Sequence, residues 1–319
     1  MHLLILGLSD IVRRRIRSAL GQSPGVARVD VATRGLADGE VARGWTEGEV
    51  FRDYRAALDR SPADVVYVSL VNSEHERWAE LAIASGRHTL VDKPACLGLR
   101  PAERLADLAQ RRGVCLAEAT VYAYHPQLDL VREQFRAAAS PPTRVTATFS
   151  FPPMASANFR YRRALGGGAL WDLGPYAASV GRIFFAAEPT TVSCAILARG
   201  GPDDVDTAFA MLTTFPDGRS VVGSFGFDTV YRNRIDVVGA NVGVELDRVF
   251  TTPPDLASQL RVTRREGTST LAAPPADAFA AFFDHVSRVL KARDWTTLTE
   301  DLVADARTVR RLRDAAGEE

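Results

Sequence analysis

The segment Leu3–Val12, LLILGLSDIV, joins a short apolar run to the start of an amphipathic stretch. Leu3–Leu8 has the length and composition of a buried strand, and Ser9–Leu20 repeats its apolar residues at roughly helical spacing. Further strand-like runs follow, separated by amphipathic stretches of helical length, at Val29–Thr33, Val65–Leu70, Thr89–Val91 and Val114–Ala117. This alternation predicts an α/β fold with a parallel, doubly wound sheet.

Two of the intervening helices have recognisable ends. Ser73 and Glu76 are spaced as a capping box, and Gly86 stands where that helix would stop. The next helix is expected to start at Pro101 and to end at Gly113.

The second part of the chain has a different pattern. Val145–Phe151, Thr191–Leu197 and Ala208–Phe215 alternate apolar and polar residues, which predicts antiparallel strands with one covered face. Thr251–Pro275 is expected to be loop and edge strand. We therefore predict a dinucleotide-binding domain over residues 1–120 and an α+β domain with a large, mostly antiparallel open sheet over 121–319. The final helix, about 299–315, is expected to pack back across that boundary.

The composition excludes several functional classes. The 319 residues carry 39 Lys plus Arg and 39 Asp plus Glu, so neither a nucleic acid nor a membrane is indicated as a partner. No apolar stretch approaches the roughly 20 residues of a membrane span. Three scattered cysteines and five histidines show no metal-ligand or disulfide spacing, so we expect no metal and a cytoplasmic location.

The turn after the first strand is a candidate dinucleotide site. Such a site needs an open turn so that N–H groups at the helix start can face a pyrophosphate. Here Gly7 keeps the first glycine of the G-x-G-x-x-G pattern, Ser9 and Val12 replace the other two, and Asp10 and Ile11 lie between them. The alternative is a plain strand-to-helix turn in which Ser9 or Asp10 is only a cap.

The end of the second strand bears on cofactor choice. An acid there favours NAD, whereas an arginine can pair with the 2′-phosphate of NADP. The sequence offers Thr33 and Arg34, and Asp30 lies in mid-strand. NADP is therefore predicted over NAD.

Polar residues also follow the third and fourth strands, where open α/β sheets bind ligands. Leu70 ends the third strand, Asn72 and His75 follow it, and Asp92 and Lys93 follow the fourth strand; all five are predicted to contact the cofactor. A lysine beside a nicotinamide could give a proton or hydrogen bond to a carbonyl oxygen. The alternative for Lys93, which precedes a proline, is a surface turn residue.

Four segments in order resemble the Gfo/Idh/MocA oxidoreductases. They are the turn Gly7–Val12, Asn72–His75, Asp92–Pro94 where the family usually has Glu-Lys-Pro, and Gly166–Tyr176, similar to the family's G-G-G-x-L-x-D-x-G-x-H/Y pattern. Glu118 and the Tyr124–Gln127 stretch fit the same series. The resemblance implies a Rossmann domain, an α+β domain whose open sheet forms a homodimer or homotetramer, and Lys93 with Tyr176 as the catalytic pair.

The resemblance also implies substrate contacts in the second domain. Asp172 would orient the substrate or Lys93 if it shared a helix face with Tyr176, but Pro175 favours a helix that starts near Gly174. The alternative to a catalytic role is that Tyr176 is an amphipathic tyrosine packed in the core. The residues expected to bind substrate are Tyr122, Tyr124, His125, Asn158, Arg160, Asp172 and Tyr176.

The implied activity is hydride transfer between NADP(H) and a sugar carbonyl or hydroxyl. In having a tyrosine at position 176, the chain is similar to family members that reduce 3-keto groups of dTDP- or UDP-linked deoxysugars. A sugar, cyclitol or dihydrodiol dehydrogenase of the same family is the alternative. A catalytically silent dinucleotide-binding sensor or scaffold is the alternative from another class, because two motif glycines are missing.

Overall fold

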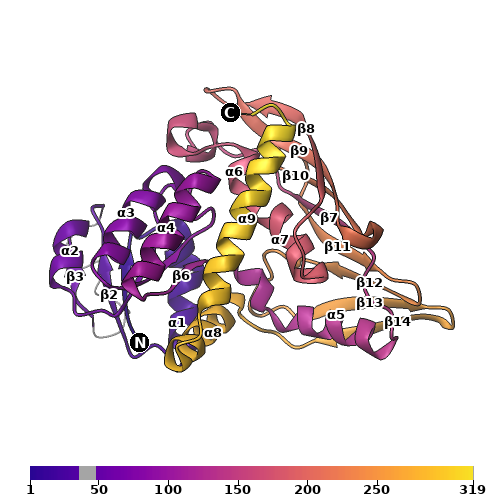
Figure 1. The fold of residues 1–319 in the computed structure, drawn as a ribbon, viewed down its shortest axis with the longest axis horizontal. Coiled ribbons are helices and arrows are strands. Elements are labelled where there is room, and N and C mark those ends of the chain that lie inside the picture. The colour runs from indigo at the N-terminus through magenta and orange to yellow at the C-terminus, as the bar shows by residue number, and fades with distance from the viewer. Residues whose placement is uncertain (36–47, 319) are drawn as a thin grey trace. The chain divides into compact units, whose positions relative to one another are not determined.

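The computed structural model describes residues 1–35 and 48–318, which divide into two compact units (Figure 1). The first contains Met1–Ala119 and Phe279–Val303. The second contains Thr120–Ala278 and, among the described residues, 304–318. The C-terminal helix Thr296–Ala315 therefore contributes residues to both.

Among the described residues of the first unit, six parallel strands are ordered β3-β2-β1-β4-β5-β6. The strands are β1 (His2–Leu6), β2 (Arg28–Ala32), β3 (Val50–Phe51), β4 (Val65–Val68), β5 (His88–Val91) and β6 (Leu116–Glu118). The helices of this part of the chain are η1 (Val12–Ile16), α1 (Arg17–Gln22), α2 (Tyr54–Arg60), α3 (Asn72–Ala84), α4 (Leu99–Arg112), α8 (Ala278–Ala292) and the start of α9 (Thr296–Ala315).

The strand order explains how the first unit builds a site. Leu3–Leu6 has no exposed surface, as expected for a central strand of a parallel sheet covered on both faces. Because β1, β4 and β5 are neighbours and run parallel, Gly7, Ser69 and Asp92, the residues at or just beyond their carboxyl ends, meet on one edge. The predicted doubly wound sheet is confirmed.

Two local predictions differ from the structure. The helix after β1 begins with one π-helical segment, η1, before α1. Helix α3 begins at Asn72 with Val71 as its N-cap and no side-chain cap, so the capping box of Ser73 and Glu76 is wrong. Gly86 does follow the end of α3 with a φ of +81°.

The second unit contains a mostly antiparallel sheet; its eight described strands are ordered β14-β13-β12-β11-β7-β10-β9-β8. The strands are β7 (Arg144–Ser150), β8 (Thr191–Gly200), β9 (Val205–Thr214), β10 (Ser220–Gly226), β11 (Arg232–Val238), β12 (Val242–Asp247), β13 (Ser258–Arg264) and β14 (Gly267–Ala273). The helices are η2 (Val121–Tyr124), α5 (Pro126–Ala137), η3 (Phe159–Tyr161), η4 (Arg163–Leu165), α6 (Ala169–Asp172), α7 (Gly174–Phe185), η5 (Pro216–Gly218) and the end of α9.

One face of this sheet carries the helices. Helix α5 packs on β12–β14, α7 on β7 and β10, and α6 on β9. The strands alternate accordingly: along β10, Val221 is fully buried whereas Val222 is 49% exposed on the opposite face. The predicted antiparallel sheet is confirmed, but the segment expected to be loop and edge strand also supplies β13, which is paired on both sides.

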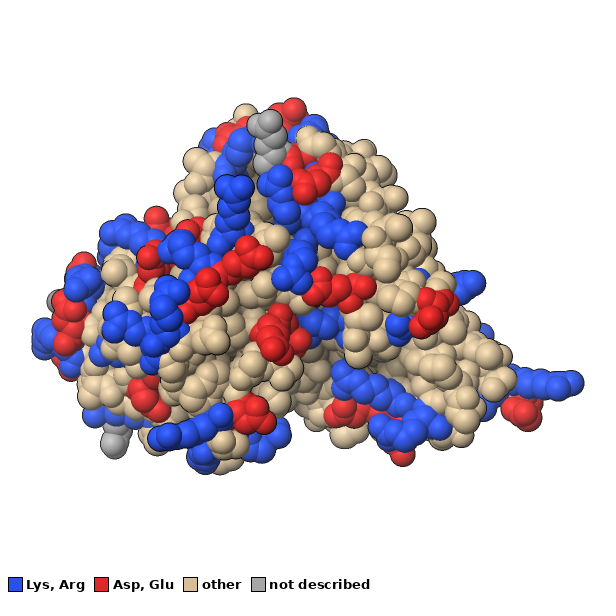
Figure 2. Space-filling model, viewed as in Figure 1, with Lys and Arg blue, Asp and Glu red and all other residues tan. Residues whose placement is uncertain are grey.

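Charged residues of both signs are interspersed over the face of the molecule in Figure 2, in keeping with the equal numbers of acidic and basic residues. Within residues 1–35 and 48–318, no helix is long and apolar enough to cross a membrane.

Candidate active site

Gly7 makes the turn after β1 possible. Its φ is +98°, and a Cβ built on it would lie 2.1 Å from the carbonyl oxygen of Ser69 and 2.6 Å from a methyl carbon of Leu70. Both distances are well inside van der Waals contact, and a positive φ disfavours any L-side chain. Gly7 therefore allows the tight turn after β1 that the first glycine of a dinucleotide-binding motif provides.

Ser9 occupies the position of the second motif glycine. Its hydroxyl oxygen accepts from the N–H of Val12 at 3.3 Å and lies 2.7 Å from the hydroxyl of Ser69. Asp10 is exposed and Ile11 half-buried at the start of the helix. The capping expected of Ser9 is thus present, together with the open turn that a dinucleotide needs.

The end of β2 presents an arginine and keeps its acid inside. Arg34 is exposed, with its guanidinium 4.5 Å from the ring centroid of Tyr54, and Thr33 is buried. Asp30 has no exposed surface and accepts from Ser61 at 2.6 Å and from the N–H of Glu49 at 2.9 Å. Burial alone would raise the pKa of Asp30, but these hydrogen bonds and nearby His2 and Arg28 hold it below its usual value. Asp30 is therefore an internal support and not a ribose ligand.

Lys93 lies on the loop Asp92–Ala95 that follows β5 and contains a cis peptide bond before Pro94. The Asp92 carboxylate accepts from the Tyr67 hydroxyl at 2.5 Å and from the Ser69 hydroxyl. Lys93 itself is half-buried. The first residue of the loop is thus tied to β4 and to the residue just after it.

The other half of the loop is held by two more contacts. The ring nitrogens of His75 lie 2.8 Å from the carbonyl oxygen of Pro94 and 3.0 Å from that of Leu70. The Glu118 carboxylate accepts from the N–H of Ala95 at 2.8 Å. His75 is 1% exposed, so its place in the expected cofactor set becomes an indirect one: it holds the backbone on which Leu70 and the lysine loop lie.

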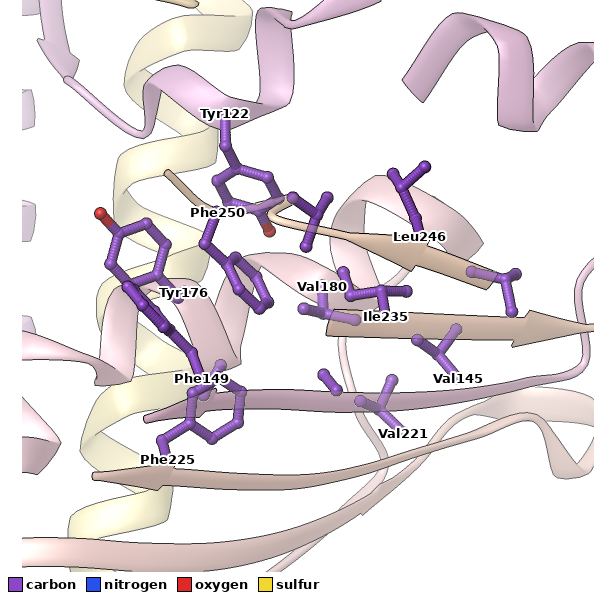
Figure 3. Packing of buried hydrophobic residues seen from close by; sticks show 14 of the residues in the cluster. Tyr122, Val145, Phe149, Tyr176, Val180, Val221, Phe225, Ile235, Leu246 and Phe250 are labelled. Carbon is purple, nitrogen blue, oxygen red and sulfur yellow. The ribbon is translucent and has the colours of Figure 1, made fainter. Parts of the chain in front are cut away.

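Tyr176 stands at the rim of an aromatic cluster in the second unit. Its ring centroid is 5.3 Å from those of Phe149 and Phe250 and 5.8 Å from that of Tyr122. Figure 3 shows the Tyr176 hydroxyl directed away from Phe149 and Phe250. The apolar rings therefore fix the tyrosine ring while its polar end leaves the cluster.

Asp172 is paired with an arginine near Tyr176. Asp172 ends α6 and Tyr176 belongs to α7, so the condition for a shared helix face is not met; Pro175 lies in the first turn of α7, which begins at Gly174 as predicted. Arg160 donates from Nε to Asp172 at 2.7 Å. Burial lowers the pKa of the Arg160 guanidinium, but the Asp172 carboxylate and then Tyr176 raise it, with a net rise.

The glycine run allows Arg160 to reach that position. The N–H of Gly168 donates to the carbonyl of Arg160 at 2.9 Å, and the N–H of Gly167 donates to that of Arg162 at 3.0 Å. A Cβ on Gly167 would lie 2.5 Å from the Arg160 carbonyl oxygen. Asn158 accepts from the N–H of Arg160 at 3.1 Å. Asn158 therefore supports Arg160 in this segment.

The aromatic segment before α5 is engaged inside the second unit. Tyr122 is 1% exposed and its hydroxyl lies 2.8 Å from that of Ser179; burial raises the pKa of Tyr122 although Ser179 lowers it. His125 is also 1% exposed, with Nε2 at 3.1 Å from the Ala276 carbonyl oxygen, and Tyr124 is half-buried. For Tyr122 and His125 a supporting role replaces the expected direct contact with substrate.

Asp206 on β9 supports the segment that follows the glycine run Gly166–Gly168. It is 3% exposed and accepts from the N–H of Leu170 at 2.6 Å, directly after the glycine run. Burial raises the pKa of Asp206 to about 6; the Leu170 N–H opposes this and the Glu318 carboxylate adds to it. The folded protein therefore binds this proton more tightly than the unfolded chain.

Replacing Asp206 with Asn should remove a pH dependence of stability. Between about pH 4 and pH 6 the folded state holds more protons than the unfolded state, so the free energy of unfolding falls as pH rises through that window, by roughly 3 kcal/mol. Urea unfolding at pH 4 and pH 7 measures it. From pH 4 to pH 7 the free energy of unfolding of the variant should rise by roughly 3 kcal/mol relative to that of the original protein. The other titrating groups are common to both proteins, so their contributions cancel in this comparison. Parallel pH curves would refute the assignment.

Several supporting residues have no motif of their own. Tyr67, Ser69 and Glu118 hold the lysine loop, and Phe149 and Phe250 hold Tyr176. In the sequence Ser69, Phe149 and Phe250 read only as strand or core residues, whereas Tyr67 and Glu118 belong to segments that resemble the family. No group of three potential metal ligands occurs within residues 1–35 and 48–318.

Comparisons with known proteins match both parts of the chain. Residues 1–120 match a family described as "Oxidoreductase family, NAD-binding Rossmann fold", and residues 140–245 match the "GFO/IDH/MocA C-terminal domain". The chain is 30% identical, over 98% of its length and 94% of the relative, to a dTDP-3,4-didehydro-2,6-dideoxy-α-D-glucose 3-reductase from Actinomadura kijaniata. It is 31% identical to a protein of the same description from Streptomyces violaceoruber, over 89% and 84% of the two chains.

A solved structure agrees with these matches. A 3-ketoreductase from Actinomadura kijaniata in complex with NADP and TDP-benzene superposes with a TM-score of 0.92, at 27% identity, covering 99% of this chain and 98% of the other.

Proposed function

The chain belongs to the Gfo/Idh/MocA oxidoreductases, and from this we propose that it is an NADP-dependent reductase of a nucleotide-linked keto-sugar, with a dTDP-linked 3-keto-deoxysugar as the leading substrate class. The observation that carries the proposal is the setting of Tyr176. Its ring is fixed by three aromatic neighbours, its hydroxyl leaves them, and the Arg160–Asp172 pair lies beside it. The relatives named above are 3-reductases of this kind of sugar.

The first unit fits a dinucleotide. Gly7 forms a cradle that a Cβ would fill, and the start of η1 offers backbone N–H groups near Ser9, Asp10 and Ile11. We assign the 2′-phosphate to Arg34, next to Thr33. The nicotinamide is assigned to the edge formed by Leu70, Asn72, Asp92 and Lys93.

The proposed reaction reduces a sugar carbonyl group to an alcohol. When bound, NADPH would supply the hydride that the carbonyl carbon takes up and would itself be oxidised to NADP⁺. Tyr176 gives its hydroxyl proton to the carbonyl oxygen, which becomes the alcohol, and recovers a proton from solvent. Lys93, on the loop after β5 of the first unit, is assigned as the second member of the catalytic pair, whose ammonium would stabilise negative charge that develops during proton transfer. Arg160 and Asp172 orient the sugar beside Tyr176, and Asn158 supports Arg160.

Replacing Arg34 with Ala tests the cofactor assignment. The variant should bind NADPH about 10- to 100-fold more weakly, since it loses charge-assisted hydrogen bonds to a phosphate, while NADH affinity changes little. Fluorescence titration of both nucleotides measures the two dissociation constants. Arg112→Ala, which removes an exposed arginine at the far end of α4, is the matched control. Equal losses for NADPH and NADH would reject the assignment.

We also propose that the open face of the second unit's sheet joins copies of the chain. Leu212 and Val222 are cross-strand neighbours on this face and are 42% and 49% exposed, and Leu197 on β8 is 57% exposed. Exposed apolar side chains gathered on one sheet face are typical of a protein interface.

The double variant Leu212→Glu/Val222→Glu should therefore shift the protein from an oligomer to a monomer in sedimentation. Burying two carboxylates in a dry interface is unfavourable by several kcal/mol. Ala137→Glu, at the exposed end of α5, should leave the oligomer intact. A protein that is monomeric without substitution would disprove the interface.

A further inference from the structure

Two of the positions at which this protein departs from its family's motifs, Ser9 and Asp92, belong to one series of hydrogen bonds. Ser9 stands where the pattern has glycine, and Asp92 stands where the family usually has glutamate. The hydroxyls of Ser9 and Ser69 are 2.7 Å apart, and Ser69 donates to Asp92. Ser69 therefore bridges the dinucleotide turn and the lysine loop.

The direction of these hydrogen bonds follows from the groups involved. An ionised Asp92 carboxylate only accepts, so the Ser69 proton points to it. The oxygen of Ser69 is then the acceptor for the Ser9 hydroxyl. The oxygen of Ser9 in turn accepts from the N–H of Val12 at 3.3 Å. Every donor in this series of hydrogen bonds therefore points the same way, from Val12 through Ser9 and Ser69 to Asp92.

This direction has a consequence for Ser9. Its single proton is directed to Ser69, so it has no hydroxyl proton to give to a phosphate. At this turn the dinucleotide would meet backbone N–H groups only, and the serine side chain serves the linkage to the lysine loop.

Burial of Ser69 and Tyr67 restricts the motion of this linkage. Ser69 is 1% exposed and Tyr67, which donates to the second oxygen of Asp92, has no exposed surface. The N–H of Ser69 donates to the Leu6 carbonyl at 2.9 Å, next to Gly7. A shift of the turn is therefore transmitted to Asp92 and to the loop that carries Lys93.

We propose that Ser9, Ser69 and Asp92 are positioning residues that couple dinucleotide binding at the Gly7–Val12 turn to the placement of Lys93. The coupling rests on the proposed function for the identity of the ligand, but the linkage itself exists in the free protein. By reciprocity, occupation of the turn should order the lysine loop, and loosening that loop should weaken binding at the turn.

Hydrogen exchange of the full chain tests the linkage without any ligand. Ser9→Ala should speed amide exchange in a peptide that covers residues 92–98 by at least about 5-fold, while the β2 peptide stays unchanged. Ser18→Ala, an exposed serine on α1, is the matched control and should leave both peptides unchanged. Unchanged exchange at 92–98 in Ser9→Ala would overturn the proposal, whether or not the protein binds NADPH.

NADPH titration then tests the coupling. Ser9→Ala and Ser69→Ala should each weaken NADPH binding about 3- to 10-fold and lower kcat, and the double variant should be no worse than either single one, since both break one linkage. Ser9→Thr keeps the hydroxyl and should restore the original values. Multiplicative losses would show that Ser9 and Ser69 act independently of each other and would overturn the coupling. Failure of the unsubstituted protein to bind NADPH would reject the proposed function instead, with the exchange result still deciding the linkage.

Discussion

Tyr176→Phe should lower kcat for keto-sugar reduction by roughly 10²- to 10⁴-fold, the usual contribution of a positioned general acid, and should change the NADPH dissociation constant less than about 2-fold. The substitution removes one oxygen and keeps the ring that packs against Phe149 and Phe250. Because the hydroxyl points out of that cluster, its loss should not disturb folding.

Steady-state turnover with NADPH and the keto-sugar measures this effect. Tyr231→Phe is a control, because that tyrosine also packs against Phe149, with ring centroids 6.5 Å apart, yet has no assigned chemistry; unlike the buried Tyr176, it is 37% exposed. It should keep turnover within about 2-fold. Undiminished turnover in Tyr176→Phe would remove the tyrosine from the proton-transfer step.

Gly7→Ala should both destabilise the protein and abolish tight NADPH binding. The new methyl would meet the Ser69 carbonyl oxygen at 2.1 Å, and the φ of +98° adds strain for an L-residue. Together these are expected to lower the free energy of unfolding by about 3 kcal/mol or more. Any structural relief moves the turn away from Ser69, so NADPH affinity should fall at least about 100-fold.

Gly21→Ala provides the comparison within the same unit. Gly21 lies in α1, and a Cβ there meets nothing within 4 Å. This variant should be more stable by up to about 1 kcal/mol, since alanine favours the helix. Urea unfolding and NADPH titration of both variants separate the two cases. A Gly7→Ala protein with unchanged stability and affinity would show that the turn is not required.

The fold could be predicted from the sequence wherever the burial of a strand determines its pattern of apolar residues. Leu3–Leu6 is a continuous apolar run because a central parallel strand is covered on both faces, and β10 alternates because only one face of its sheet is covered. The start of α3 was not predictable from Ser73 and Glu76, since Val71 rather than a serine occupies the cap position. A capping pattern does not fix the backbone register on its own.

The sequence supplied candidates for the site but not the residues that support them. Lys93 and Tyr176 were found through the family pattern. Ser9 and Ser69 are 60 residues apart and meet only because β1 and β4 are neighbours, which no local pattern states. For the same reason Asp206 could not be linked to the glycine run before Leu170.

The most direct measurement is the oxidation of NADPH on addition of a dTDP-linked 3-keto-2,6-dideoxy sugar, followed by absorbance, with NADH in a parallel cuvette. We expect stoichiometric conversion of NADPH and the ketone to NADP⁺ and the 3-hydroxy sugar, with NADH at least about 10-fold less efficient. No turnover of dTDP- or UDP-linked 3-keto sugars by a protein that binds NADPH would contradict it.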